Sequence, residues 1–337
     1  MQLSELWFIL VAVLFAVFVL LEGFDFGVGM STKFLARNES EKRVLINSIG
    51  PFWDANEVWL LTAGGAMFAA FPHWYATLFS GYYIPFVVLL LCLIARGVSF
   101  EFRGKVKTRE WSNVWDWAIF LGSILPPFLL GVLFSSLIKG LPIDQEMTMH
   151  AGFLDIVNVY TVVGGIAFVM LAYMHGLMFI SLKTDGDLRV RAKQMALKMY
   201  IATAAVIVLF VGLTAVFTDA YTKRGAILIP LYLVAIVLYL LLFRFLRRNQ
   251  EGFSFATTGI ILVMVTASFF IALFPNVLIS STDTIYNLTV YNAASGHYSL
   301  KLMTIVALTM VPIVLAYTIW SYYVFRKRVT DKEHLEY

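Results

Sequence analysis

The chain has 337 residues, of which 60% are hydrophobic and 14% are charged, and it carries a formal net charge of +4. Together with a mean hydropathy of +0.82, these values exclude a soluble globular domain and indicate an integral membrane protein. The one cysteine, Cys92, excludes an internal disulfide and a cluster of thiolate metal ligands.

At least nine apolar stretches are long enough to cross about 30 Å of hydrocarbon as a helix, which takes about 20 residues. In chain order they are Leu6–Phe26, Pro51–Phe71, Trp74–Ala95, Trp115–Ile138, Val157–Ile180, Tyr200–Phe217, Ala226–Phe245, Phe255–Phe274 and Leu300–Phe325. The sequence therefore predicts an all-α polytopic membrane protein with nine transmembrane helices.

No polar linker divides the chain, so we expect a single integral membrane domain over residues 1–337. Four spans return the chain to its starting side, and spans one to four and five to eight can therefore form two four-helix bundles in the same orientation. The expected bundles cover residues 1–139 and 151–275. The helix over 300–325 is left over as a peripheral helix.

The basic residues indicate how the chain is oriented. Of the 25 Lys and Arg residues, only Lys139, Lys223, Arg224 and Lys301 fall in loops on one side, and all others fall on the opposite side. Loops that stay in the cytoplasm collect Lys and Arg. The sequence predicts a multi-pass membrane protein with the N-terminus outside and the C-terminus in the cytoplasm.

Acidic residues interrupt the first span near its end, in "LEGFDFGVGM" (residues 21–30). Glu22 and Asp25 are three positions apart and therefore share one face of a helix. Gly23 and Gly27 form a pair of small residues on roughly the other face, which favours close contact with a neighbouring helix.

Two later stretches carry polar residues at a similar depth. "GPFWDANEVWLLTAGG" contains Asp54 and Glu57, and "ARGVSFEFRGKVK" contains Arg96 and Glu101. Asp54 in a first helical turn is also explained by the helix dipole, and Arg96 by extension of its side chain to the membrane interface. Trp53 flanks the acids and is expected to shield them.

A carboxylate near hydrocarbon is costly and requires a partner, a bundle interior or water. The acids of the first three spans and Arg96 are therefore expected to gather near the cytoplasmic face. One hypothesis is a proton entry path, and the other is a salt-bridge cluster that only fixes three helices. His175 is the one histidine within a span, which is more typical of a hydrogen-bonded core residue than of a haem ligand.

Three motifs together, "LEGFDFGVGM", "GPFWDANEVWLLTAGGAMFAAFP" and "ARGVSFEFR", closely resemble subunit II of the bacterial cytochrome bd-type quinol oxidases. The likeness extends along the whole chain. It implies a subunit of a terminal respiratory oxidase of the bacterial cytoplasmic membrane, which oxidises quinol and reduces dioxygen to water.

The resemblance also implies that haem b, haem d and the quinol site belong to a partner, subunit I, while this chain binds no cofactor or metal itself. A small single-span accessory subunit is a further possible partner. The family's conserved acids and arginine would correspond to Asp25, Asp54, Glu57 and Arg96, with roles in proton delivery and in support of the subunit interface.

Two other functions stay open from the residues alone. Acids in membrane helices also mark ion pathways, as in a proton-coupled secondary transporter. A purely structural assembly subunit with inert acids is the other alternative, since buried charged networks can serve packing specificity.

Overall fold

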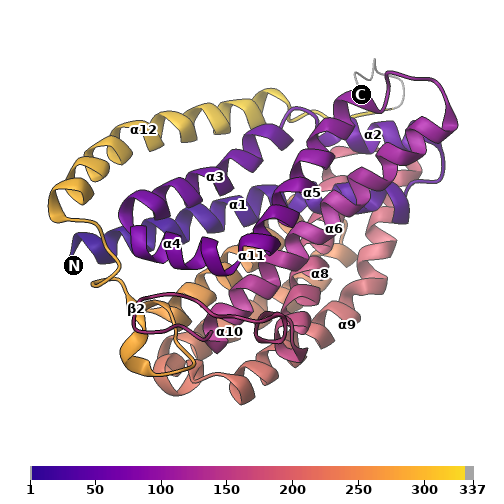
Figure 1. Ribbon diagram of the computed structural model, residues 1–337. Coiled ribbons are helices and arrows are strands. Elements are labelled where there is room, and N and C mark those ends of the chain that lie inside the picture. Colours follow the sequence, from indigo (N-terminus) through magenta and orange to yellow (C-terminus); the bar gives the residue numbers. More distant parts are fainter. Residues whose placement is uncertain (1, 331–337) are drawn as a thin grey trace.

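The computed structural model describes residues 2–330, and they are almost entirely helical (Figure 1). Within this range, eight helices are long and apolar enough to cross a membrane. These are α1 (Leu3–Phe34), α5 (Tyr83–Phe102), α6 (Arg109–Lys139), α8 (Val159–Lys183), α9 (Gly186–Phe217), α10 (Ala220–Arg247), α11 (Glu251–Leu273) and α12 (His297–Val324). The predicted all-α polytopic architecture is confirmed.

Shorter elements connect these helices. They are α2 (Glu39–Ile49), α3 (Trp53–Ala70), α4 (Pro72–Gly81), α7 (Phe153–Ile156) and the 3-10 turn η1 (Thr284–Tyr286). The strands β1 (Asn276–Leu278) and β2 (Leu288–Thr289) pair antiparallel in the loop before α12.

The second expected span corresponds to α3, which has 18 residues and a length of about 27 Å. Its start lies beside the end of α12, because the rings of Phe52 and Tyr322 stack at 4.4 Å. Its end lies near the start of α12, where the Ser295 N–H donates to the Ala70 carbonyl oxygen at 2.8 Å. The helix thus runs antiparallel to α12 across the molecule. The acids in its first turns lower its hydropathy, and it is therefore not one of the eight strongly apolar helices. The count of nine transmembrane helices stays a prediction.

The expected third span, 74–95, is wrong in its boundaries because the chain bends inside it. Helix α4 ends at Gly81, and α5 begins at Tyr83 and continues to Phe102. Pro85 has no N–H to donate to the Gly81 carbonyl four residues earlier, so one continuous helix could not satisfy that oxygen. Tyr82, with φ −103° and ψ 23°, makes the bend.

Two other helices are longer than predicted. Helix α1 continues to Phe34, eight residues beyond the expected end, so Glu22 and Asp25 lie inside the helix rather than near its terminus. Helix α9 begins at Gly186, whereas the sequence predicted a basic loop up to Tyr200. Lys and Arg are good helix formers, and a helix can extend beyond the hydrocarbon without losing its hydrogen bonds.

Helices α1, α6, α8 and α11 form the middle of the molecule, since α1 packs against all three others and α8 packs against α6 and α11. Helices α9 and α10 cover one side, and α12 runs along the outer side of α3 (Figure 1). Of the residues in α12, only Leu300 is buried. The division into two four-helix bundles stays a prediction, because α1 and α8 contact both expected groups.

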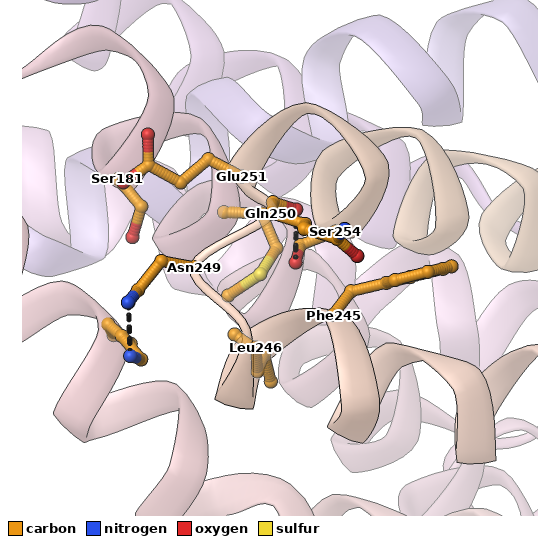
Figure 2. A pocket seen from close by; sticks show the side chains of 9 residues that line it. Ser181, Phe245, Leu246, Asn249, Gln250, Glu251 and Ser254 are labelled. Carbon is orange, nitrogen blue, oxygen red and sulfur yellow. Dashed lines mark hydrogen bonds between the residues drawn. The ribbon is translucent and has the colours of Figure 1, made fainter.

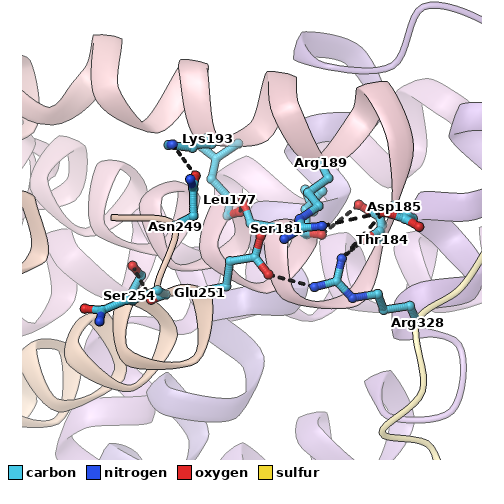
Figure 3. A network of polar contacts seen from close by, with 12 residues as sticks. Leu177, Ser181, Thr184, Asp185, Arg189, Lys193, Asn249, Glu251, Ser254 and Arg328 are labelled. Atoms are coloured by element: carbon cyan, nitrogen blue, oxygen red, sulfur yellow. Dashed lines mark hydrogen bonds and ion pairs between the residues drawn. The ribbon is translucent and has the colours of Figure 1, made fainter. Parts of the chain in front are cut away.

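Ion pairs join five connecting segments at one end of the molecule, which we call the basic end. Glu39 in α2 pairs with Arg103 after α5 at 2.7 Å, and Glu41 pairs with Arg191 of α9 at 2.7 Å. Glu251 at the start of α11 binds Arg189 of α9 and, at 2.7 Å, Arg328 after α12 (Figure 3). The loops that hold most of the Lys and Arg residues therefore lie together.

Candidate functional site

Arg96 of α5 is the centre of a buried cluster of charged side chains. Its guanidinium forms ion pairs with Glu22 of α1 and Glu57 of α3, and its Nη2 lies 2.7 Å from Glu57 Oε1. Arg96 and Glu22 are fully buried, whereas the Glu57 side chain is 19% exposed. The guanidinium also lies over the Phe26 ring, 4.7 Å from its centroid. One arginine thus holds α1, α3 and α5 together.

Because Gly122 of α6 has no side chain, α5 and α6 lie close together beside Arg96. A Cβ atom on Gly122 of α6 would lie 2.7 Å from Arg96 Cβ and 2.6 Å from the Cys92 carbonyl oxygen. Only glycine permits α5 and α6 to approach this closely. The base of the Arg96 side chain therefore lies against Gly122, while its guanidinium reaches Glu22 and Glu57.

Asp25 lies one turn beyond Glu22 on α1 and is fully buried. Its Oδ2 accepts a hydrogen bond from Asn56 Nδ2 of α3 at 2.6 Å. The Asn56 Oδ1 in turn accepts from the Tyr322 hydroxyl of α12 at 2.9 Å. Asp25 is therefore held by an amide, whereas Glu22 is held by a cation.

Several polar atoms of the cluster have no hydrogen-bond partner among the described residues. They are Glu22 Oε2, Asp25 Oδ1, Arg96 Nε and Arg96 Nη1. A buried polar group that lacks a partner destabilises the fold by about 1–3 kcal/mol. Buried water normally satisfies such groups. The cluster can therefore bind water or an extra proton without breaking its ion pairs.

Two of the predicted site residues lie outside this cluster. Asp54 in the first turn of α3 and Glu101 in the last turn of α5 are both exposed. Glu101 and Glu57 line one groove between α3 and α5, with a volume of about 470 Å³ and otherwise mostly apolar walls. Glu57 thus connects the buried cluster to this groove.

The predicted packing residues lie at helix contacts. A Cβ on Gly27 would lie 2.6 Å from Gly176 Cα, so α1 and α8 touch backbone to backbone at this pair. Gly23 faces side chains instead, and a Cβ atom there would lie 3.2 Å from Leu262 Cδ1. The Trp53 ring covers Gly97 of α5 and packs against Phe100 at 5.2 Å between ring centroids. Trp53 therefore forms part of the wall of the groove, at the start of α3.

His175 of α8 is fully buried and hydrogen-bonded on both sides. Its Nδ1 lies 2.7 Å from Thr258 Oγ1, and its Nε2 lies 3.1 Å from the Leu20 carbonyl oxygen. The ring stacks on Phe255 with 4.5 Å between centroids. Both nitrogens are occupied, so this side chain does not fit an axial haem ligand.

The cavity at the turn between α10 and α11 is too small for an organic substrate. Its volume is about 10 Å³, close to the space for one water molecule (Figure 2). Ser181 and Asn249 are among the side chains around it. We therefore place no substrate site there.

Sequence reasoning missed two members of the site. Asn56 lies inside a quoted motif, between Asp54 and Glu57, but a neutral amide gave no signal beside two acids. Tyr322 comes 266 positions after Asn56, in a stretch that reads as an ordinary apolar span. Only the packing of α12 beside α3 brings the two together.

Comparisons with known proteins agree with the fold and the motifs. The family described as "Cytochrome bd terminal oxidase subunit II" matches residues 3–325. The chain is 56% identical over 336 residues to "Cytochrome bd ubiquinol oxidase subunit 2" of Bacillus subtilis (strain 168), covering 100% of this chain and 99% of the relative. It is 34% identical to "Cytochrome bd-I ubiquinol oxidase subunit 2" of Escherichia coli (strain K12), covering 99% and 97%.

A solved structure shares the fold. A chain in "The structure of bd oxidase from Geobacillus thermodenitrificans" superposes with a TM-score of 0.76 at 15% identity, over 96% of this chain and 97% of that chain. Fold and sequence together define a multi-pass subunit of a bacterial membrane oxidase. The chain belongs to the cytochrome bd terminal oxidase subunit II family. The predicted resemblance is confirmed, and the chain is part of a quinol oxidase complex.

Proposed function

We propose that this subunit takes up protons from the cytoplasm and delivers them toward the haem-bearing partner, subunit I, where dioxygen is reduced. One observation carries the proposal: the carboxyl groups of Glu22 and Glu57 bind Arg96 between α1, α3 and α5. In this cluster Glu22 Oε2 and Asp25 Oδ1 have no hydrogen-bond partner among the described residues. A carboxyl group in such a place can release and regain a proton while the ion pairs persist. Protons must come from the cytoplasm if the reaction is to build a membrane potential.

The groove between α3 and α5 supports a direction for the transfer. Glu57 is the partly exposed member of the cluster, and apolar side chains such as Leu61 and Leu90, which are 68% and 51% exposed, surround the groove. Ionisable groups within a membrane normally face a protein interior or water rather than lipid. We infer that subunit I docks on this face, and that Glu57 passes protons to it.

The family supports a division of labour in which the redox steps take place in the partner, where haem and quinol are expected to bind. The hydrogen bonds on both nitrogens of His175 agree with this division. The residues of this chain hold and move protons and support the interface.

The basic end is proposed to face the cytoplasm, because Lys and Arg are retained on that side. A cysteine placed at the exposed Ser40, in a chain whose Cys92 is replaced by Ser, should react with a membrane-impermeant maleimide only after cells are opened. A matched cysteine at Tyr291, at the opposite end, should react in intact cells. The reverse pattern would contradict the orientation.

Purification of the tagged chain tests the function itself. We expect it to retain a haem-rich partner in a fixed ratio and to consume oxygen with quinol. A haem spectrum, a subunit count and an oxygen electrode measure these properties. Substrate flux by the isolated chain in vesicles, without a haem partner, would instead support the secondary transporter.

A further inference from the structure

The hydrogen-bond chain from Asp25 through Asn56 to Tyr322 joins three helices that are far apart in the sequence. Asn56 is fully buried and lies between the other two side chains. Its Nδ2 also lies 3.4 Å from the Leu21 carbonyl oxygen. Asp25 and Leu21 are thus both on the amino side of the amide, and the Tyr322 hydroxyl is on its oxygen side.

We infer that Tyr322 is a positioning residue for Asp25: its hydroxyl fixes the Asn56 amide so that the N–H₂ group faces the carboxyl. An ionised carboxylate has no hydrogen to donate, so it requires N–H from Asn56. The Asn56 oxygen must then face a donor, and the Tyr322 hydroxyl donates to it. Without that donor, a buried amide oxygen is left unsatisfied and the amide loses its preferred orientation.

Burial of the helix body does not explain why Tyr322 lies there, because most residues of α12 are exposed and only Leu300, near its start, is buried. Aromatic contacts hold the ring itself. It stacks on Phe52, and its centroid lies 6.3 Å from that of Phe24 in an edge-to-face contact. The hydroxyl is therefore aimed at Asn56 by rings that belong to α1 and to the start of α3.

The segment after α12, residues 325–330, anchors the helix end, and we call it the C-terminal strap. Lys183 donates to the carbonyl oxygens of Phe325 and Lys327, and the Val329 N–H donates back to the Lys183 carbonyl at 2.8 Å. Arg328 donates to the Thr184 carbonyl at 3.0 Å and pairs with Glu251 (Figure 3). The strap ties α12 to the loop between α8 and α9 and to α11. It thereby fixes how far Tyr322 reaches toward Asn56.

This inference rests on the proton role proposed for Asp25, so its test needs a readout of Asp25 itself. Infrared difference spectra of the purified complex at acidic and alkaline pH report carboxyl C=O bands. The band that Asp25→Asn removes belongs to Asp25. Tyr322→Phe deletes one hydroxyl and keeps the ring. Tyr323→Phe is the matched control, because Tyr323 is the next residue and is 62% exposed.

We expect Tyr322→Phe to displace the Asp25 band and to slow quinol-driven oxygen consumption about two- to tenfold, the range that one buried hydrogen bond carries. Haem content and subunit ratio should match the wild type. Tyr323→Phe should change none of these. Arg328→Ala, which loosens the strap without touching the hydrogen-bond chain, should displace the same band by a smaller amount.

The outcomes distinguish the positioning role of Tyr322 from the proton role of Asp25. An Asp25 band that stays in place in both Tyr322→Phe and Arg328→Ala overturns the positioning role and leaves the proton role intact. Equal displacement in Tyr323→Phe also overturns it, since the effect would then not depend on the Asn56 contact. A complex with no Asp25 band across the pH range contradicts proton exchange at Asp25, and with it the proposed function.

Discussion

The Asp25→Asn complex is expected to assemble normally and to consume oxygen with quinol at least about tenfold more slowly than the wild type. The substitution preserves the shape of the side chain and lets its amide oxygen accept from Asn56 Nδ2, as Asp25 does now at 2.6 Å. It removes the group that can exchange a proton. Oxygen uptake, measured per haem on the purified complex, gives the result directly.

Asp187→Asn provides the control for Asp25→Asn. Asp187 lies at the start of α9 near the basic end and is exposed, so its loss should leave the rate unchanged. Full activity in an assembled Asp25→Asn complex would remove Asp25 from the path. It would favour the alternative in which the buried acids serve only assembly.

Arg96→Ala is expected to prevent stable assembly rather than to slow a step. The change leaves Glu22 fully buried and Glu57 largely buried without their counter-charge. Breaking a buried ion pair by removing one partner typically destabilises a protein by about 3–5 kcal/mol. We expect a marked loss of haem content and of subunit I from the purified material, measured by the haem spectrum and the subunit ratio.

Two further variants test whether the unpaired buried charge causes the loss of assembly. Arg248→Ala, at an exposed position after α10, should assemble like the wild type. The double change Arg96→Ala with Glu22→Gln removes both members of the fully buried pair and should recover part of the assembled complex. Normal haem content in Arg96→Ala alone would show that the cluster does not hold α1, α3 and α5 together.

Hydrophobic patterning predicted the helical class and most membrane helices, because about 20 apolar residues in a row leave few alternatives in a bilayer. It did not predict the break at Tyr82, since the bend depends on Pro85 within an otherwise uniform apolar run. It also ended the first span at Phe26, where the apolar run gives way to glycines and polar residues. In the structure Gly27 continues the helix and packs against Gly176.

The candidate site was predictable where opposite charges are present. Glu22, Glu57 and Arg96 were expected together, and the structure brings them into direct contact. Depth along a helix does not reveal the direction of a side chain, and for that reason Asp54 and Glu101 were grouped with them although both are exposed. Their predicted roles remain untested.

The contact between Arg96 and Glu22 has a consequence for biosynthesis. The ribosome makes α1 first, and 74 positions separate Glu22 from the arginine that balances the acids of this helix. A charged side chain at the centre of an isolated helix disfavours insertion by about 2.5–3.5 kcal/mol. The acids of the first helix therefore lack their counter-charge until the nascent chain brings α5, with Arg96, alongside α1.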